Sequence, residues 1–287
     1  MDAFVILFTV ILLASANGVL GTYLVLRKSV MIGDAISHAV LPGLIIGFLI
    51  SGSKNSFPML ISAAISGVLT TLLIQYLNRK SNLPKDASIG FVFTTLFAIG
   101  IIMVSVYADN IDIDADCVLH GELGFIALEQ NLMIGGMELF PLSSLNALVT
   151  LIIVLLFTIL FKRQLFVTTF DPQYANAIGM NPIKWDNALM ALTSLVTVVS
   201  FEAVGAILVI AFLVLPVAAA YLLTTKLKNM MILSVVFSML ACVIGYYLSQ
   251  ALNTSISSAI VTSMGVLFCL SFIFVLLNKR RVTYEGS

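Results

Sequence analysis

The sequence predicts an all-α, polytopic integral membrane protein of about nine transmembrane helices, and three observations support this fold class. Hydrophobic residues make up 60% of the 287 residues and charged residues only 10%, and the mean hydropathy is +1.12. A soluble domain has about 25% charged residues, so this chain cannot cover a surface of its size with polar groups. Apolar runs long enough to cross a bilayer recur along the chain, and almost all basic residues fall on one side of them.

Nine apolar runs come close to the roughly 20 residues that a helix needs to cross the hydrocarbon core. Each must be helical, because lipid gives the backbone no hydrogen-bond partners. The predicted spans are residues 3–26, 30–50, 58–77, 87–107, 142–161, 186–200, 203–224, 230–250 and 256–277. The sixth is short and meets the seventh at Ser200-Phe201-Glu202, so eight spans is the alternative count. A cleaved signal peptide needs a basic stretch before its apolar run. This chain has none there, so we expect the first run to be a permanent span. We expect one transmembrane domain over residues 1–287.

The basic residues predict the orientation of the chain. Of the 14 Lys and Arg residues, only Lys54 lies outside the segments that follow spans one, three, five, seven and nine. Those segments contain Arg27, Lys28, Arg79, Lys80, Lys85, Lys162, Arg163, Lys184, Lys226, Lys228, Lys279, Arg280 and Arg281. The positive-inside rule makes them cytoplasmic. The N-terminus is then outside and the C-terminus cytoplasmic, which requires an odd number of spans.

Acidic residues gather in the segment between spans four and five, which this orientation places outside. Carboxylates at the mouth of a pathway raise the local concentration of cations. Within this segment we expect an entrance formed by Asp112, Asp114, Asp116, Cys117, His120 and Glu122. The mixture of carboxylate, thiol and imidazole is typical of metal sites, but a solvated acidic loop with structural capping residues explains it equally well.

Ionisable residues inside spans are rare and usually functional, and the second span has two of them. Asp34 and His38 are four residues apart, so they share one helix face. A carboxylate oxygen beside an imidazole nitrogen suits Mn²⁺, Fe²⁺ or Zn²⁺, and the lack of a thiolate argues against Cu(I). The alternative is a buried Asp–His pair that only fixes helix packing.

Glu202 is a third candidate ligand, from the break between spans six and seven. At the outer interface its carboxylate would instead meet water.

The longest predicted cytoplasmic connection, residues 164–185, contains a short helix signal. Asp171 is a typical N-cap, Pro172 a typical first helical residue and Gly179 a typical stop. These residues predict a helix over 171–179 beneath the membrane, although an ordinary amphipathic linker has a similar composition.

The sequence has no GxxxxGK[ST] loop for ATP and no HExxH motif. The net charge of zero gives no indication of nucleic-acid binding.

Several of these stretches together resemble the permease subunits of ABC transporters that import manganese, zinc or iron. GDAISHAVLPG at residues 33–43 is similar to the family's signature, and the resemblance extends over nearly the whole chain. Residues 116–122 resemble the family's outer segment. Phe170-Asp171-Pro172 resembles the cytoplasmic segment that contacts the ATPase, and the run from Val204 to Ala220 resembles the late spans.

The resemblance implies a multi-pass subunit of the bacterial inner membrane without catalytic activity or a bound cofactor of its own. Its partners would be a second, identical or homologous permease, two cytoplasmic ATP-binding subunits, an extracellular solute-binding protein and membrane lipid. Asp34 and His38 match the family's intramembrane metal positions, and the coupling segment would comprise Phe170, Asp171, Pro172, Tyr174 and Ala175. The transported ion would be Mn²⁺, favoured by hard, thiol-free ligands, with Zn²⁺ and Fe²⁺ as alternatives.

Two other functional classes fit parts of the sequence. In a proton-coupled secondary transporter of metals, Asp34 and His38 would serve as a proton relay as well as ligands. In a membrane enzyme the same pair would hold a catalytic metal. The sequence contains no nucleophile or general base in a recognisable arrangement, so the enzyme is the weaker alternative.

Overall fold

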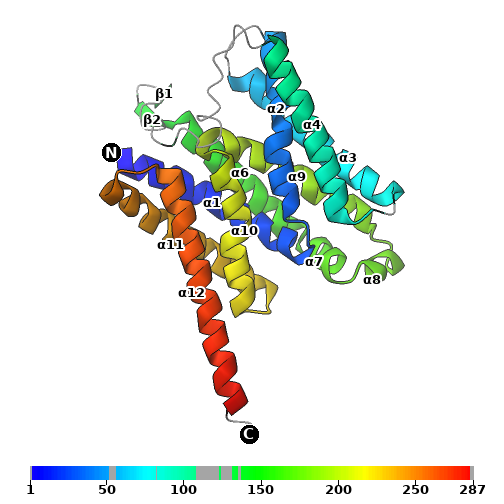
Figure 1. The fold of residues 1–287 in the computed structure, drawn as a ribbon, viewed down its shortest axis with the longest axis vertical. Helices are drawn as coiled ribbons and strands as arrows, with labels where there is room; N and C mark the ends of the chain where they lie inside the picture. Colours follow the sequence, from blue (N-terminus) through cyan, green and yellow to red (C-terminus); the bar gives the residue numbers. More distant parts are fainter. Residues whose placement is uncertain are drawn as a thin grey trace.

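The computed structural model describes residues 2–51, 56–81, 83–107, 123, 131–134 and 137–284, and helices dominate these ranges (Figure 1). The long helices are α1 (Asp2–Leu26), α2 (Met31–Ser51), α3 (Ser56–Lys80), α4 (Lys85–Tyr107), α6 (Leu142–Leu160), α9 (Pro182–Val204), α10 (Ala206–Leu223), α11 (Leu227–Leu252) and α12 (Ile256–Tyr284). The short helices α7 (Lys162–Phe170) and α8 (Pro172–Ala177) connect α6 to α9. Within the described ranges nine helices are long and apolar enough to cross a membrane, which agrees with the predicted span count.

One small element was not expected from the sequence. An antiparallel pair of strands, β1 (Asn131–Ile134) and β2 (Met137–Pro141), lies between α4 and α6. Ile134 pairs with Met137, and Asn131 pairs with Pro141. This pair adds a minor β element to a molecule that is otherwise helical where it is described.

The predicted boundaries of the sixth span, 186–200, are wrong. The corresponding helix α9 has 23 residues and begins at Pro182, because the Asn181 side chain accepts hydrogen bonds from the backbone N–H groups of Ile183 and Lys184. The division from α10 lies at Gly205, whose φ of 81° is accessible to glycine at little cost. Glu202 is therefore inside the last turn of α9 instead of in a connection.

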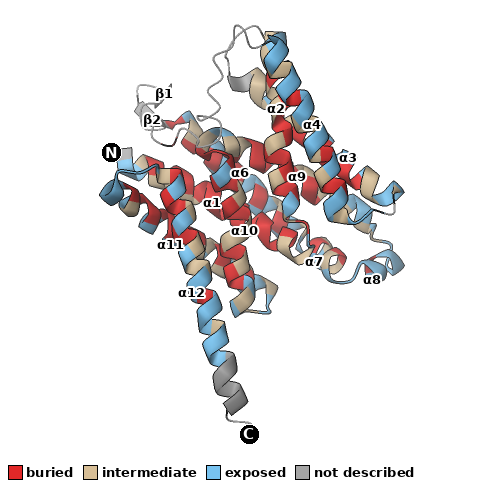
Figure 2. Cartoon of the chain, in the orientation of Figure 1, coloured by how far each residue is buried: buried red, intermediate tan, exposed pale blue. Residues whose placement is uncertain are grey.

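The helices form a buried interior surrounded by exposed apolar surface. Figure 2 shows buried residues concentrated on α1, α9 and α10, and exposed residues along α4 and α12. Large apolar side chains such as Ile102, Ile159 and Phe274 are more than half exposed. In a membrane protein such side chains face lipid or another subunit, because lipid is as apolar as they are.

Helix α2 is held closely against α3 by two glycines. A Cβ atom on Gly43 would lie 2.7 Å from the backbone oxygen of Ser62, and one on Gly47 would lie 3.0 Å from the Cα atom of Met59. These residues form a GxxxG pair, which lets two helix backbones approach each other. The Ser66 hydroxyl donates a hydrogen bond to the Ala39 carbonyl across the same interface, at 2.9 Å.

Four of the basic connecting segments meet at one end of the bundle, which we call the basic end. Arg27 forms an ion pair with Asp186 at the start of α9, and Lys85 at the start of α4 contacts the Ser29 hydroxyl. Arg79 at the end of α3 donates a hydrogen bond to the Asn187 side chain at 3.1 Å. The α10–α11 connection joins them through a small cluster of Val217, Ala220 and Met230 that packs against Val25, Leu26 and Leu233. The side of the membrane that this end faces remains a prediction from its charge.

Candidate functional site

Asp34 and His38 form a close pair in the first two turns of α2. His38 Nε2 lies 3.4 Å from Asp34 Oδ1, and the two side chains are 31% and 38% exposed, respectively. The i, i+4 spacing on a continuous helix creates this proximity locally. The pair is thus partly sheltered and partly open, as a site that receives and releases a ligand requires.

Two aromatic residues of α4 hold the His38 ring. The imidazole centroid lies 5.3 Å from the ring centroids of both Phe93 and Phe97, in tilted and edge-on geometry. One side of the imidazole is therefore covered by apolar carbon, while the Asp34 carboxylate lies beside its Nε2 atom. This packing restricts the orientation of the ring and leaves the carboxylate side for polar contacts.

The pair alone supplies two metal donors. Within the part of the chain that the structure describes, no group of three or more His, Cys, Asp or Glu side chains could hold a metal ion. Zn²⁺ usually takes four ligands, and Mn²⁺ takes up to six. The pair can contribute to a divalent site but does not complete one.

Among the residues that the structure describes, Glu202 is not grouped with this pair. The Arg27–Asp186 ion pair shows that α2 and α9 begin at the same end. At 1.5 Å per residue, His38 is about 10 Å from the start of α2 and Glu202 about 30 Å from the start of α9. The exposed Glu202 side chain lies in the last turn of α9, at the other end of that helix from Asp186, and it forms no three-residue metal-binding group with Asp34 and His38 within the described residues. The structure brings Asp34 and His38 together but does not bring Glu202 to them.

The proposed acidic entrance lies outside the described residues. This applies to Asp112, Asp114, Asp116, Cys117, His120 and Glu122. Their role stays a prediction from the sequence.

The segment predicted to contact an ATPase contains the short helix α8, which begins one residue after its capping side chain. The Tyr174 backbone N–H donates to Asp171 Oδ1 at 2.9 Å, and Pro172 occupies the first helical turn. Gly179 follows the helix with φ of 79°, and Ala175 is fully buried. In contrast, the aromatic side chains of Phe170 and Tyr174 are more than half exposed. The segment is thus anchored through Ala175 of α8, and it exposes Tyr174 of α8 and Phe170 at the end of α7.

Comparison with known proteins identifies the family of this chain. The model of the ABC 3 transport family matches residues 3–275. The chain belongs to this family. It is therefore a multi-pass permease subunit of the bacterial inner membrane, from the metal-transporting branch of the ABC permeases.

Individual relatives cover nearly the whole permease. It is 41% identical over 270 residues to the manganese transport system membrane protein MntD of Bacillus subtilis, covering 94% of this chain and 90% of that relative. It is 34% identical to the zinc transport system membrane protein TroD of Treponema pallidum, covering 92% and 71%. Among solved structures, PsaBC from Streptococcus pneumoniae in complex with a Fab is similar with a TM-score of 0.75 and 31% identity, covering 93% and 89%.

The permease also contains a partly buried polar centre around Arg27 that its sequence indicates only weakly. The guanidinium of Arg27 donates from Nη1 to Asp186 at 2.9 Å, from Nε to Thr169 at 3.0 Å and from Nη2 to Thr168 at 3.0 Å. This centre joins the α1–α2 connection to α7 and α9 at the basic end. Asp186 follows Lys184 at the end of a basic connection, but its partner Arg27 is 159 residues away in the sequence, so spacing along the chain does not indicate the pairing.

Proposed function

We propose that this permease is the transmembrane subunit of an ATP-driven importer of divalent metal ions, with Mn²⁺ as the favoured cargo and Zn²⁺ or Fe²⁺ as alternatives. The observation that carries the proposal is the Asp34–His38 pair, in which a carboxylate oxygen and an imidazole nitrogen lie 3.4 Å apart on one helix face. The names of relatives that transport manganese and zinc support the same cargo class.

In this proposal the pair lowers the cost of moving a dication through the membrane. A bare divalent ion in hydrocarbon is prohibitively unfavourable, so carboxylate charge and direct ligands must replace its water. Asp34 provides the charge, and His38, oriented by Phe93 and Phe97, provides a nitrogen ligand. Further ligands would come from water or from a second permease subunit facing the open side of the pair.

The other sequence candidates take separate places along the path. Glu202, at the end of α9 away from the basic end, would meet the ion before it reaches Asp34 and His38. An extracellular solute-binding protein would deliver the ion at the same end, next to the acidic segment between α4 and α6. Two ATP-binding subunits would dock at the basic end against α8, where Phe170 and Tyr174 are exposed. ATP hydrolysis would take place in those subunits, so the permease itself would not be an enzyme.

The energy source separates this proposal from a proton-coupled transporter. We expect metal uptake into vesicles only when the permease is assembled with its ATP-binding subunits and supplied with ATP. The measurement is ⁵⁴Mn²⁺ uptake by proteoliposomes, with a non-hydrolysable ATP analogue as the control. Uptake by the permease alone, driven by a pH gradient, would contradict the proposal and favour the secondary transporter.

The position of α8 gives a second test, of docking and orientation together. A photo-crosslinking residue in place of the exposed Asn176 should capture an ATP-binding subunit, because α8 lies at the basic end. The matched control replaces Thr254, which is exposed in the α11–α12 turn at the opposite end. If position 176 captured only the solute-binding protein, the predicted orientation would be inverted.

A further inference from the structure

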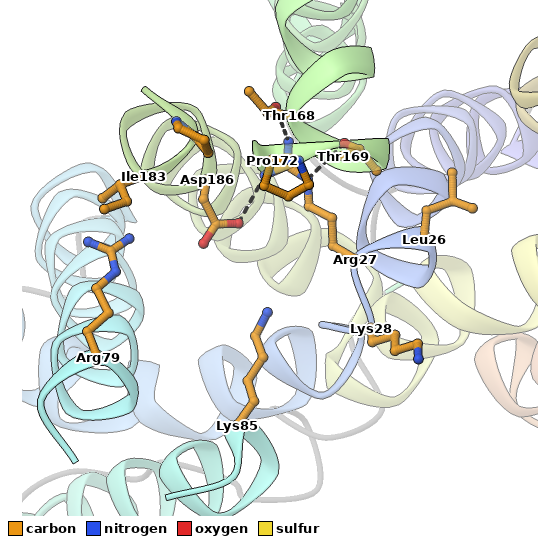
Figure 3. Close-up of a pocket in the computed structure, with 11 residues that line it drawn as sticks. Leu26, Arg27, Lys28, Arg79, Lys85, Thr168, Thr169, Pro172, Ile183 and Asp186 are labelled. Atoms are coloured by element: carbon orange, nitrogen blue, oxygen red, sulfur yellow. Dashed lines mark hydrogen bonds and ion pairs between the residues drawn. The ribbon is translucent and has the colours of Figure 1, made fainter. Parts of the chain in front are cut away.

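A cavity of about 380 Å³ lies at the basic end, next to the first residue of α8 (Figure 3). Five separate segments contribute to its wall: the α1–α2 connection, α3, α4, α7–α8 and the start of α9. Its charged lining residues are Arg27, Lys28, Arg79, Lys85 and Asp186. None of them belongs to the Asp34–His38 site, so the cavity requires a separate explanation.

The charges around this cavity do not balance. Asp186 is the single carboxylate among the lining residues, and it is paired with Arg27 at 2.9 Å. No other ion pair involves the lining residues within the described part of the chain. Lys28, Arg79 and Lys85 therefore leave a surplus of three positive charges around this open pocket, although the exposed Lys28 side chain points away from it (Figure 3).

The geometry directs part of this surplus into the cavity. Figure 3 shows the Lys85 side chain rising into the space framed by Arg27, Arg79 and Asp186. The Lys85 ammonium contacts the Ser29 hydroxyl, which is neutral. Arg79 donates to two amide oxygens, those of Gln75 and Asn187, which are neutral as well. Within the described part of the chain neither cation has a carboxylate at ion-pair distance, although Asp186 and Asp86 attract Lys85 from further away. Lys85 is partly buried and Arg79 is exposed, so the cost of an unpaired charge falls mainly on Lys85.

We propose that this cavity binds a phosphate group, either the headgroup phosphate of an anionic lipid or free phosphate. The surplus positive charge repels a divalent cation, so the cavity is not a station for the transported metal. Arginine and lysine together are the usual protein groups for phosphate, because they form short charge-assisted hydrogen bonds to its oxygens. A lipid source fits the location, because polybasic clusters near the cytoplasmic leaflet attract anionic headgroups.

A phosphate at this position would connect the two functional parts of the permease. Lys85 begins α4, which carries the Phe93 and Phe97 rings that pack on His38. On the other wall, Pro172 begins α8. The anion would tie α4 to the segment that contains α8, and so would stabilise one arrangement of the metal site relative to the ATPase docking helix. This site does not depend on the identity of the transported ion.

Binding to the purified full-length permease tests the proposal. Trp185 is the single tryptophan of the chain, lies next to Asp186 and packs on Phe161 at 4.9 Å, so its fluorescence reports on this wall. We would titrate inorganic phosphate at constant ionic strength, and separately phosphatidylglycerol or phosphatidylcholine in mixed micelles. The readouts are Trp185 fluorescence and the midpoint of thermal unfolding.

We expect a saturable response to phosphatidylglycerol, to phosphate or to both, with no response to phosphatidylcholine beyond that of the micelle. A response to phosphatidylglycerol alone assigns the site to a lipid headgroup, and a response to phosphate alone assigns it to the free anion. Lys85→Gln and Arg79→Gln should each weaken binding by about tenfold. The control Lys80→Gln removes an exposed charge from the same turn of α3, outside the cavity, and should leave binding unchanged.

The absence of any saturable response would overturn the proposal, and so would an equal loss of binding in Lys80→Gln and Lys85→Gln. If phosphate and lipid fail to bind, we would also measure whether Lys85→Gln weakens co-purification of the ATP-binding subunit. If it does, the surplus charge docks a protein carboxylate and not a phosphate group. Metal uptake in the assembled transporter, measured in parallel, keeps this outcome distinct from failure of the import proposal.

Discussion

Replacing Asp34 by Asn, or His38 by Gln, is expected to lower Mn²⁺ uptake by the assembled transporter by about 100-fold. Loss of a residue that only orients a ligand already costs 10–100-fold in many metal sites, and here a direct ligand would be lost. Both replacements keep side-chain volume and hydrogen-bonding capacity, so α2 should still pack against α3 and α4. The measurement is the initial rate of ⁵⁴Mn²⁺ uptake at saturating ATP.

A matched control is available for the charge change. Asp86→Asn alters an exposed carboxylate in the first turn of α4, at the same end of the bundle and outside the site, and should leave uptake unchanged. A second measurement, the effect of Mn²⁺ on the unfolding temperature, distinguishes a ligand role of Asp34 and His38 from a purely structural one. Mn²⁺ should raise the unfolding temperature of the wild-type complex but not of the two site variants. If both variants import Mn²⁺ and Zn²⁺ at normal rates, the Asp34–His38 pair only fixes helix packing.

Asp186→Ala should destabilise the permease by about 3–5 kcal/mol, the typical cost of leaving a buried charge without its partner. The Arg27 side chain is only 7% exposed, and without Asp186 its guanidinium would keep just the hydroxyls of Thr168 and Thr169. Exposed ion pairs usually contribute less than about 1 kcal/mol, so burial is what makes this effect large. The measurement is chemical unfolding in detergent, followed by the fluorescence of Trp185.

A double variant tests the physical reason. Arg27→Met combined with Asp186→Leu removes both charges, and such replacements of buried pairs are often neutral or stabilising. We therefore expect the double variant to recover most of the stability lost in Asp186→Ala. If Asp186→Ala is as stable as Asp86→Ala, which removes an exposed carboxylate of α4, the ion pair does not stabilise the basic end.

The spans could be predicted from the sequence because lipid imposes a simple rule on each of them. About 20 apolar residues must form one helix, whatever the rest of the chain does. The rule failed for the sixth span, where polar residues such as Lys184 and Asp186 interrupt the apolar run. There the helix begins at Pro182, after the Asn181 cap, so α9 includes polar residues that the predicted span left out.

The candidate site was predictable to the extent that it is local. Asp34 and His38 meet because they are one helical turn apart, and that spacing is visible in the sequence. The Glu202 carboxylate is another of these rare ionisable groups. Its position relative to Asp34 and His38 depends on how α9 packs against α2, which residues close to Glu202 in the sequence do not reveal. Phe93 and Phe97 carry no polar signal, so their packing against His38 could not be expected.

The sequence by itself determined the class of the protein, the number of its spans and the Asp34–His38 pair, because each depends on residues close together in the chain. Only the tertiary structure decided that Glu202 does not join that pair in one metal-binding group within the described residues. It also decided that Arg27 meets Asp186 and that Lys28, Arg79 and Lys85 line a pocket beside this ion pair. Such contacts join residues 56 to 159 positions apart and depend on how helices cross, which hydropathy and spacing along the chain do not encode.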